Sequence, residues 1–347
     1  MQEKDQKIIL KTKVKILKMR VLMISKSLPA SFKGGIQTHV WELSGHLIAA
    51  GIHVSILTGG SIRQKVSHSQ MEGRDIIHLP FLPWRKFPWF RDSLEELAFN
   101  VAAARWVYTN HEKYDIIHLQ GRSGYLIPFL GIHTPVVNTV HRLWSVEGKW
   151  ANSDFRNRLE AIIFDKITCF IEERAIKKSE AVIAVSQTTI EEIMDKVKIN
   201  LNKISLVYNG ANSRNGVPKV CTVKDQLLFV GRLCTIKGIF PLIEAMAAFK
   251  FPGKLVMVGD GPAHAELISL IEQKGLNDKV QLLGSQKQTV VRKLMRESYA
   301  LILPSFHESQ GIVLLENNIE GRPVLATDAA GIKEVVFHQH NGLLFPS

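Results

Sequence analysis

Short apolar runs alternate with longer amphipathic stretches along most of this chain. The apolar runs, each short enough for a buried strand, lie at 20–25, 54–57, 115–119, 136–140, 181–185, 204–208, 227–230, 255–258, 280–283, 299–303 and 324–327. Between them, apolar residues recur at helical spacing, as at 36–50 and 238–249. Buried strands that alternate with helices predict mainly parallel sheets covered on both faces.

The strand–helix rhythm is interrupted once and then starts again. The interruption is NSRNGVP, residues 212–218, whose composition favours a linker. The pattern therefore predicts an α/β chain of two Rossmann-like, doubly wound domains, 20–212 and 213–347, preceded by a basic extension, 1–19. Open α/β sheets bind ligands beyond the carboxyl ends of their strands. We expect the two domains to face each other across a cleft that holds the ligands.

Composition and charge narrow the possible partners. The chain has 347 residues, of which 46% are hydrophobic and 22% charged, so it can bury two cores. Its three cysteines lack zinc-site spacing, and no apolar run reaches the length of a membrane span, which favours a cytoplasmic protein. The net charge of +12 either favours anionic partners or only keeps the chain soluble. Nucleic-acid-binding motifs are absent from the sequence, so we expect no nucleic acid as a partner.

Two segments leave their roles open. Residues 1–18 are rich in lysine, and three interpretations are open. The segment is a disordered tail, it precedes a true start at Met19, or it contacts anionic lipid. In FLPWRKFPWFR, residues 81–91, aromatic side chains alternate with cations. That composition suits a membrane interface or a lipid-linked acceptor, and equally a loop packed against the core. A peripheral position at the inner membrane face is one expectation from it.

The segment HESQGIVLLE, residues 307–316, carries the strongest chemical signal. It follows the apolar strand 299–303 and places Glu308 and Glu316 on either side of a glycine and an apolar helix start. Backbone N–H groups at a helix N-terminus bind phosphate. The candidate phosphate contacts are Gly311, Ile312 and Val313. A phosphate site flanked by two carboxylates, which can accept hydrogen bonds from hydroxyl groups, would suit a nucleotide sugar as the ligand.

Two cations follow the strand at 227–230. Arg232 and Lys237 lie in the loop VGRLCTIKG, where a guanidinium and an ammonium suit a diphosphate. They would offset the charge that builds up on a departing diphosphate. The alternative is that both are solvated loop cations, which are common.

Further candidates lie at strand ends in the first half of the chain. Gly34 and Gly35 follow the first strand and precede a helix, so their backbone can approach a ligand closely, although a plain turn explains them equally well. His141 follows the strand at 136–140, and His118 ends the strand DIIH. Each can reach a ligand beyond the sheet, but a lone histidine is more often structural.

Several motifs are missing from the sequence. It contains no D-x-D, no H-E-x-x-H, no G-x-S-x-G and no complete G-x-G-x-x-G. We therefore predict no catalytic metal, no serine-hydrolase chemistry and no dinucleotide cofactor.

Nine segments, taken in order, resemble glycosyltransferase family 4, a group of retaining enzymes with the GT-B fold and an E-x7-E motif. They are SFKGGIQTHV, DIIHLQG, NTVHRLW, AVIAVSQ, LVYNGAN, LLFVGRLCTIKG, KLVMVGDGPAHAEL, LILPSFHESQGIVLLE and GRPVLATDAAGIKEVV. The resemblance spans about 20–346, nearly the whole chain. It implies the GT-B fold, with an acceptor on the N-terminal domain and a nucleotide sugar on the C-terminal domain.

The resemblance also implies roles for residues at matching positions. Arg232 and Lys237 would bind the donor diphosphate, Glu308 would contact the transferred sugar, and Glu316 would hold the ribose. Backbone N–H groups from Gly311 to Val313 would meet phosphate. The residues implied in the N-terminal domain are Gly34 and Gly35 at the diphosphate and His141 near the sugar.

The chain departs from the family pattern in places. Gln310 stands where an aromatic residue is common, and NNIEG follows Glu316 in place of a run of small residues. Enzymes that resemble this one continue for two or more helices beyond the position of Ser347. We therefore expect the C-terminal helices to be missing and the activity to be reduced.

Together these features predict a metal-independent, retaining hexosyltransferase. It would move a sugar from a nucleoside diphosphate sugar to a hydroxyl of a glycan or lipid-linked acceptor, in polysaccharide or glycolipid synthesis. Two alternatives stay open: a nucleotide-sugar epimerase on a similar scaffold, and a catalytically inactive binding protein.

Overall fold

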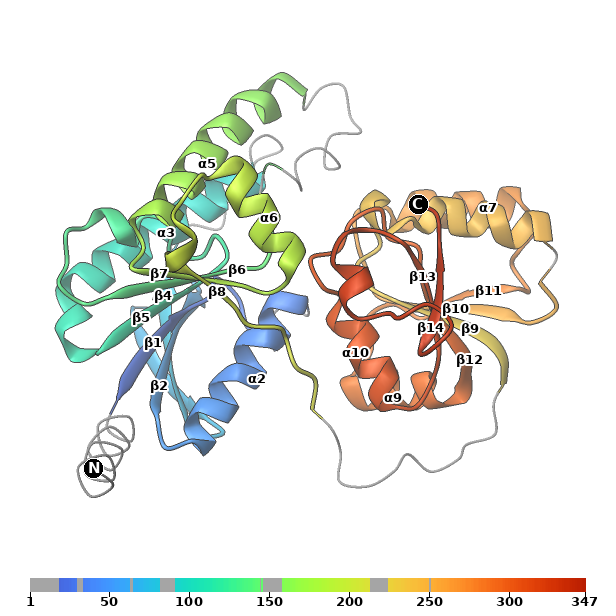
Figure 1. The fold of residues 1–347 in the computed structure, drawn as a ribbon, viewed down its shortest axis with the longest axis horizontal. Coiled ribbons are helices and arrows are strands. Elements are labelled where there is room, and N and C mark those ends of the chain that lie inside the picture. The colour runs from blue at the N-terminus through green and yellow to red at the C-terminus, as the bar shows by residue number, and fades with distance from the viewer. Residues whose placement is uncertain are drawn as a thin grey trace. The chain divides into compact units, whose positions relative to one another are not determined.

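The computed structural model describes residues 19–29, 34–62, 65–81, 91–143, 145, 158–212, 224–249 and 251–347. The chain divides into two compact units, the first comprising Met1–Ala184 and Thr189–Val207, the second Val185–Thr188 and Tyr208–Ser347. Each unit is a β-sheet with helices on both faces (Figure 1). The α/β class and the two Rossmann-like units are confirmed. The predictions for 1–18, for 82–90 and for the linker at 213–218 lie outside the described residues.

The first unit is built on an eight-stranded sheet of order β3-β4-β2-β1-β5-β6-β7-β8. Its strands are β1 (Arg20–Ile24), β2 (His53–Gly60), β3 (Ser67–Met71), β4 (Arg74–Pro80), β5 (Ile116–Gln120), β6 (Val136–Val140), β7 (Ala181–Ala184) and β8 (Ile204–Leu206). Its helices are α2 (Gly35–Ala49), α3 (Arg91–Asn110), α5 (Arg158–Lys178) and, from Thr189 onward, α6 (Gln187–Lys196). All described strand pairs are parallel except β3 with β4. Helices lie on the connections from β1 to β2, β6 to β7 and β7 to β8, whereas β2 reaches the parallel strand β4 through β3.

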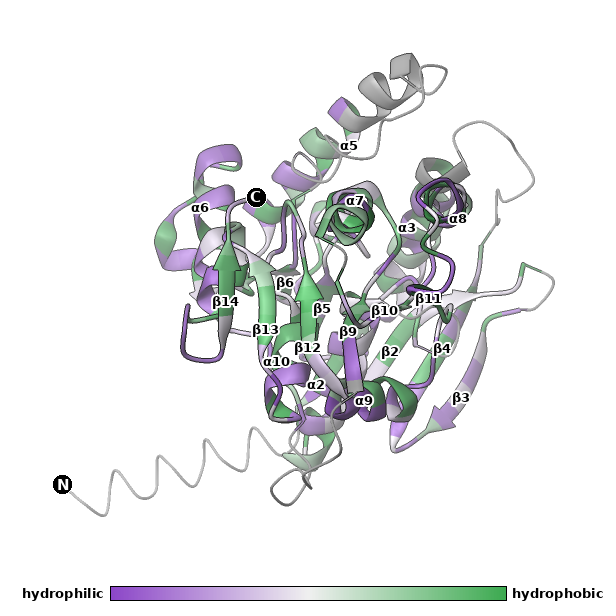
Figure 2. Cartoon of the chain, turned by 90° about the vertical axis from the view of Figure 1, so that its right-hand side faces the viewer, coloured by the Kyte–Doolittle hydropathy of each residue, from purple (hydrophilic) through white to green (hydrophobic). Residues whose placement is uncertain are grey.

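The edge strand β3 escaped prediction, and so did its neighbour β4. It pairs with β4 through the two-residue turn Glu72–Gly73 and is mostly exposed. Its sequence SHSQM has little apolar content, and Figure 2 shows it as hydrophilic. A polar edge strand protects a sheet from pairing with another chain, and the same property hides it from a search for apolar runs.

The second unit is built on a six-stranded sheet of order β11-β10-β9-β12-β13-β14, with every described pair parallel. Its strands are β9 (Lys224–Val230), β10 (Lys254–Val258), β11 (Val280–Leu282), β12 (Ser298–Leu303), β13 (Val324–Thr327) and β14 (Gly342–Phe345). Its helices are α7 (Ile239–Phe249), α8 (His264–Gln273), α9 (Gln288–Glu297) and α10 (Ile312–Ile319). The last strand, β14, was not predicted.

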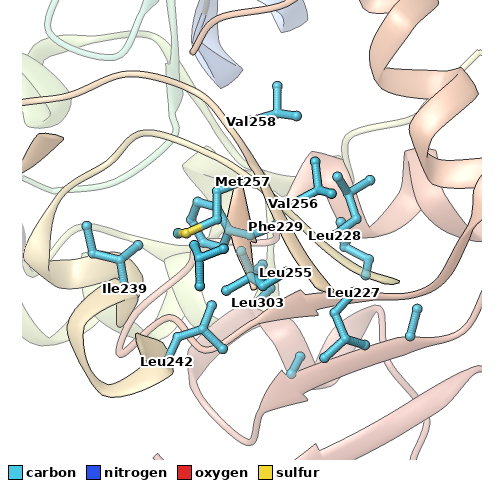
Figure 3. Close-up of a cluster of buried hydrophobic side chains, with 14 of the residues drawn as sticks. Leu227, Leu228, Phe229, Ile239, Leu242, Leu255, Val256, Met257, Val258 and Leu303 are labelled. Carbon is cyan, nitrogen blue, oxygen red and sulfur yellow. The ribbon is translucent and has the colours of Figure 1, made fainter. Parts of the chain in front are cut away.

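The core of the second unit forms where α7 packs on the middle strands. Phe229 and Met257 reach it from β9 and β10, and Leu303 reaches it from β12, all at most 1% exposed (Figure 3). Ile239 and Leu242 face them from α7. Each such side chain contributes about 1.5–3 kcal/mol through burial, which holds the strand ends in fixed positions.

The strand order reverses once in each sheet. In the first sheet β1 lies between β2 and β5, and in the second β9 lies between β10 and β12. Connections that leave the two strands on either side of such a reversal diverge, and open α/β sheets bind ligands there. The topology therefore points to the loops after β1 and β5 in one unit, and after β9 and β12 in the other.

Candidate functional site

The loops after β9 and β12 are held together by their backbones. The first loop ends in the short 3-10 helix η6 (Thr235–Lys237) and Gly238, whose φ of +65° is left-handed. A Cβ at Gly238 would overlap the carbonyl group of Pro304, so only glycine allows this approach. The N–H of Phe306 also donates to the carbonyl of Ile236 at 2.9 Å. The two loops thus form one rigid surface at the reversal point.

On this surface Lys237 and Glu308 form an ion pair through Nζ and Oε1. Their side chains are only 17% and 9% exposed. Ser305 Oγ donates to the same oxygen of Glu308 at 3.3 Å, and the N–H of Gly331 donates to the Glu308 carbonyl at 2.9 Å. The structure therefore brings together two residues that the sequence identified separately, and it fixes their carboxylate and ammonium in place.

The helix α10 begins directly after this loop. Its N-cap is Gly311, with a left-handed φ of +81°, and a Cβ there would lie 2.8 Å from Leu314 Cδ1. A glycine N-cap has no side chain with which to satisfy the first N–H groups of the helix. The backbone of Ile312 and Val313 therefore presents donors of the kind that bind phosphate, beside Glu308.

Glu316 lies on α10 and is oriented from a neighbouring helix. Nε2 of Gln288, the first residue of α9, donates to Glu316 Oε1 at 2.7 Å. Glu316 is partly exposed, so its carboxylate stays accessible to a ligand. Gln288 was not identified from the sequence, because a glutamine at a helix start carries no distinctive pattern.

Arg232 behaves differently from Lys237, its predicted partner in the diphosphate clamp. Its side chain is exposed, and it makes no hydrogen bond or ion pair with any described residue. Lys237, in contrast, is already paired with Glu308. The loop thus carries one cation fixed by a carboxylate and one that is free to move toward an anion.

In the first unit the glycine pair opens α2. Gly34 is the N-cap, in an extended conformation with φ −149° and ψ 169°. A Cβ at Gly35 would meet no atom within 4 Å. Neither strain nor packing within the described residues therefore requires glycine at position 35. The open space beside it is consistent with the close approach of a ligand.

His141 is buried in a polar network rather than exposed at the strand end. Its Nε2 lies 3.0 Å from Gln120 Oε1, and its ring packs edge-on against His39 with centroids 4.7 Å apart. Gln120 Nε2 lies 3.2 Å from His118 Nε2, which lies 2.7 Å from Thr139 Oγ1. The sequence named His118 and His141 but missed Gln120, which bridges them, and His39, which packs against His141.

Burial keeps these rings uncharged. It lowers the pKa of His118 to about 4, with a smaller effect of His39 in the same direction. It also lowers the pKa of His141 well below its usual value, with contributions from His39 and His118. Both rings are therefore neutral at physiological pH.

Gln310, the residue that departs from the family pattern, has a structural contact of its own. Its Oε1 accepts hydrogen bonds from the backbone N–H and the side-chain amide of Asn209, at 2.8 and 2.7 Å. Both residues are buried and belong to the second unit. An aromatic side chain could not make these bonds, so Gln310 ties the segment at 209 to the loop that carries Glu308.

Two features are absent from the described residues: a cluster of metal ligands and a membrane-spanning helix. In the part of the chain that the structure describes, His, Cys, Asp and Glu side chains nowhere gather in a group of three that could hold a metal ion. Over the same residues, every helix is too short or too polar to cross a bilayer.

Comparison with known proteins agrees with this arrangement. The family model "Glycosyltransferase Family 4" matches residues 33–214, and "Glycosyl transferases group 1" matches 220–347. An uncharacterized glycosyltransferase of Methanocaldococcus jannaschii is 27% identical over 353 residues, covering 94% of this chain and 84% of the relative.

Solved structures share the fold. Sucrose-phosphate synthase of Thermosynechococcus elongatus superposes with a TM-score of 0.77 at 21% identity, over 94% of this chain and 86% of that one. The HepE protein of Anabaena, in complex with UDP and glucose, gives 0.72 at 19% identity, also over 94% and 86%.

Two mainly parallel α/β sheets of this order give the chain the GT-B fold of these solved structures. The two family models that match it are both models of glycosyltransferases. The match of the first family model over more than half of the chain makes the assignment more specific. The chain belongs to glycosyltransferase family 4.

Proposed function

We propose that this protein transfers a sugar from a nucleoside diphosphate sugar to an acceptor hydroxyl with retention of anomeric configuration. The observation that carries the proposal is the Lys237–Glu308 pair, which lies at the strand reversal between β9 and β12 and beside the start of α10. An ammonium, a carboxylate and free helix N–H groups in one place suit a diphosphate joined to a polyhydroxylated group.

In this proposal the cationic and the acidic residues have different roles. Lys237, Arg232 and the N–H groups of 311–313 stabilise the diphosphate as it departs. Glu308 accepts hydrogen bonds from the transferred sugar, and Glu316 accepts them from the ribose. The first unit contributes the remaining contacts, with Gly34 and Gly35 at the diphosphate and His141 at the sugar. In this scheme 213–347 binds the donor and 20–212 the acceptor.

The chemical step needs no separate base. The acceptor oxygen forms a bond to the anomeric carbon while the bond from that carbon to the diphosphate breaks. The acceptor proton passes to the departing diphosphate oxygen on the same face of the sugar. A cation-lined site supplies the stabilisation that this step requires, so we propose that the transfer is independent of metal.

The comparisons and the charge of the chain support a choice of donor and of acceptor class. The complex of the HepE protein with UDP and glucose supports a uridine diphosphate hexose as the first donor to test. The net charge of +12 and the aromatic, basic segment 81–91 support a glycan or lipid-linked acceptor at an anionic membrane surface on its cytoplasmic side. Polysaccharide or glycolipid assembly is the corresponding process.

A donor panel followed by product analysis tests this proposal. Thermal shift with nucleoside diphosphate sugars should identify a stabilising donor, because a ligand stabilises the state that it binds. That donor, incubated with glycan and lipid-linked acceptors in buffer containing a metal chelator, should yield a product whose anomeric coupling constant in NMR matches that of the donor. An inverted product, or a new sugar isomer formed from donor alone, would contradict it. Donor binding without diphosphate release would instead identify an inactive binding protein.

A further inference from the structure

The buried network around Gln120 joins two histidines through a single amide. Its carbonyl oxygen lies 3.0 Å from His141 Nε2, and its nitrogen lies 3.2 Å from His118 Nε2. Thr139 Oγ1 is the second neighbour of His118 Nε2, at 2.7 Å. All four side chains are buried, so water does not compete for these contacts.

The strand pairing of β5 and β6 produces this arrangement. His118 and Gln120 are two positions apart on β5, so their side chains leave the same face of the sheet. Thr139 lies directly opposite Gln120 on β6, and His141 follows the end of β6. Neighbouring parallel strands thereby hold the amide between the two rings.

An amide has one end that only accepts and one end that only donates, and a neutral imidazole has one N–H and one bare nitrogen. Since both rings are neutral, the nitrogen that faces the amide oxygen must carry its proton and the one that faces the amide nitrogen must be bare. His141 Nε2 therefore donates to Gln120, whereas His118 Nε2 accepts from Gln120 and Thr139. Two neutral histidines that both face one amide through Nε2 cannot adopt the same tautomer.

We propose that Gln120 is a positioning residue that holds His118 and His141 in opposite tautomers, with the His141 proton on Nε2. The Nδ1 atom of His141 is then the bare nitrogen, which can accept a hydrogen bond from a hydroxyl of the donor sugar. This last consequence rests on the proposed function, in which His141 meets that sugar. The tautomers themselves do not depend on it.

Histidine NMR of the full chain tests the proposal directly. In protein labelled with 15N-histidine at pH 7.5, long-range 1H–15N correlations distinguish a protonated ring nitrogen from a bare one. His118→Gln and His141→Gln variants assign the two rings. We expect His141 with its proton on Nε2 and His118 with its proton on Nδ1. The same tautomer in both rings, or His141 protonated on Nδ1, would overturn the proposal.

Gln120→Met adds a second readout. Without the amide, the His141 nitrogen shifts should move toward the averaged values of a ring that exchanges between tautomers, and turnover should fall about tenfold. Gln226→Met is the matched control, since Gln226 is also a buried strand glutamine, bonded to Ser298 at 2.9 Å in the other unit. It should leave both rings unchanged.

The two readouts separate this proposal from the proposed function. The expected tautomers in a protein without transferase activity would contradict only the function. An active enzyme whose His141 shifts do not respond to Gln120→Met would contradict the positioning role. If Gln120→Met fails to fold, the spectrum of the unaltered chain still decides the tautomers.

Discussion

At the strand reversal of the second sheet the candidate residues are charged, whereas at that of the first sheet they are neutral and buried. Lys237 and Glu308 form an ion pair near an exposed Arg232, but His118 and His141 share one uncharged network through Gln120. Charge stabilises a phosphate leaving group, and a neutral network with fixed donors and acceptors orients a hydroxyl. In the proposed scheme, the same topology would therefore carry electrostatic stabilisation in one unit and positioning in the other.

The contrast predicts the largest effect at the exposed cation. Arg232→Ala should lower the turnover number by about 10²–10³, which is typical for removing one group that stabilises a developing anion. Because Arg232 is exposed and makes no ion pair with the described residues, the unfolding temperature should stay unchanged. Steady-state kinetics and differential scanning calorimetry measure the two quantities.

Lys254→Ala is the control for this substitution. Lys254 is exposed in the same unit but opens β10, at the opposite end of the strand from the candidate site. It should leave turnover unchanged. A turnover of Arg232→Ala within threefold of the unaltered enzyme would show that Arg232 is a solvated loop cation.

A second prediction concerns Lys237, where function and stability are not separable. Lys237→Met leaves the Glu308 carboxylate buried without its cation, so the unit should lose about 3 kcal/mol of stability, the lower end of the range for buried pairs. Glu308→Leu in addition should recover part of that loss, since no buried charge then remains. Urea unfolding followed by hydrogen exchange in β9 and β12 measures both.

An exposed pair in the same unit provides the control. Lys274 Nζ and Glu244 Oε2 lie 2.6 Å apart, and the two side chains are 32% and 52% exposed. Lys274→Met should cost less than about 1 kcal/mol, as is usual for surface ion pairs. Equal losses at both sites would mean that the Lys237–Glu308 pair is effectively solvated.

The neutral network of the first unit predicts a dependence of stability on pH. The folded pKa of His118 is about 4, below its ordinary 6.5. As pH falls through 6.5, His118 becomes protonated in the unfolded chain, whereas in the folded chain it becomes protonated only near pH 4. The free energy of unfolding should therefore fall by about 3 kcal/mol across this window. The stability that neutral His118 contributes is fully present above pH 6.5. The lowered pKa of His141 acts in the same direction.

Hydrogen exchange in β5, corrected for intrinsic rates and compared at pH 7.5 and 4.5, follows this loss in the unit that holds His118. His118→Gln should reduce the loss, because glutamine does not titrate. His340→Gln, at an exposed histidine of the other unit, should not change it. A pH dependence that is identical in all three proteins would show that His118 is protonated in the folded chain.

The sequence predicted most of the strands that are built from continuous apolar residues, but it missed β4 and β14. The bounds expected for Val136–Val140 and Val324–Thr327 agree with those observed, since both strands are buried and closed by polar residues. The polar edge strand Ser67–Met71 was missed for the opposite reason. Local pattern therefore determined most of the central strands, but it missed β4 and the edge strands β3 and β14.

Contacts within the candidate sites were less predictable. Lys237 and Glu308 are 71 positions apart, and they meet because β9 and β12 are neighbours, an order that no local pattern records. Gln120 reads in the sequence as a polar interruption at the end of a strand. Its importance becomes visible only when β5 pairs with β6 and places it between two histidines.

The smallest of these effects is expected at Glu316, where a charged group holds a ligand without stabilising the leaving group. Glu316→Ala should weaken nucleoside diphosphate binding about 10–100-fold, as removal of a hydrogen bond to a charged group does, and change turnover at saturating donor much less. Gln288→Ala should weaken binding less, since Gln288 orients Glu316 from α9 without contacting the ligand in the proposed scheme. Isothermal titration calorimetry with UDP measures both affinities. An unchanged affinity in Glu316→Ala would remove the ribose role and leave Glu316 with contacts inside the protein, such as that with Gln288, in which case both substitutions should alter only stability.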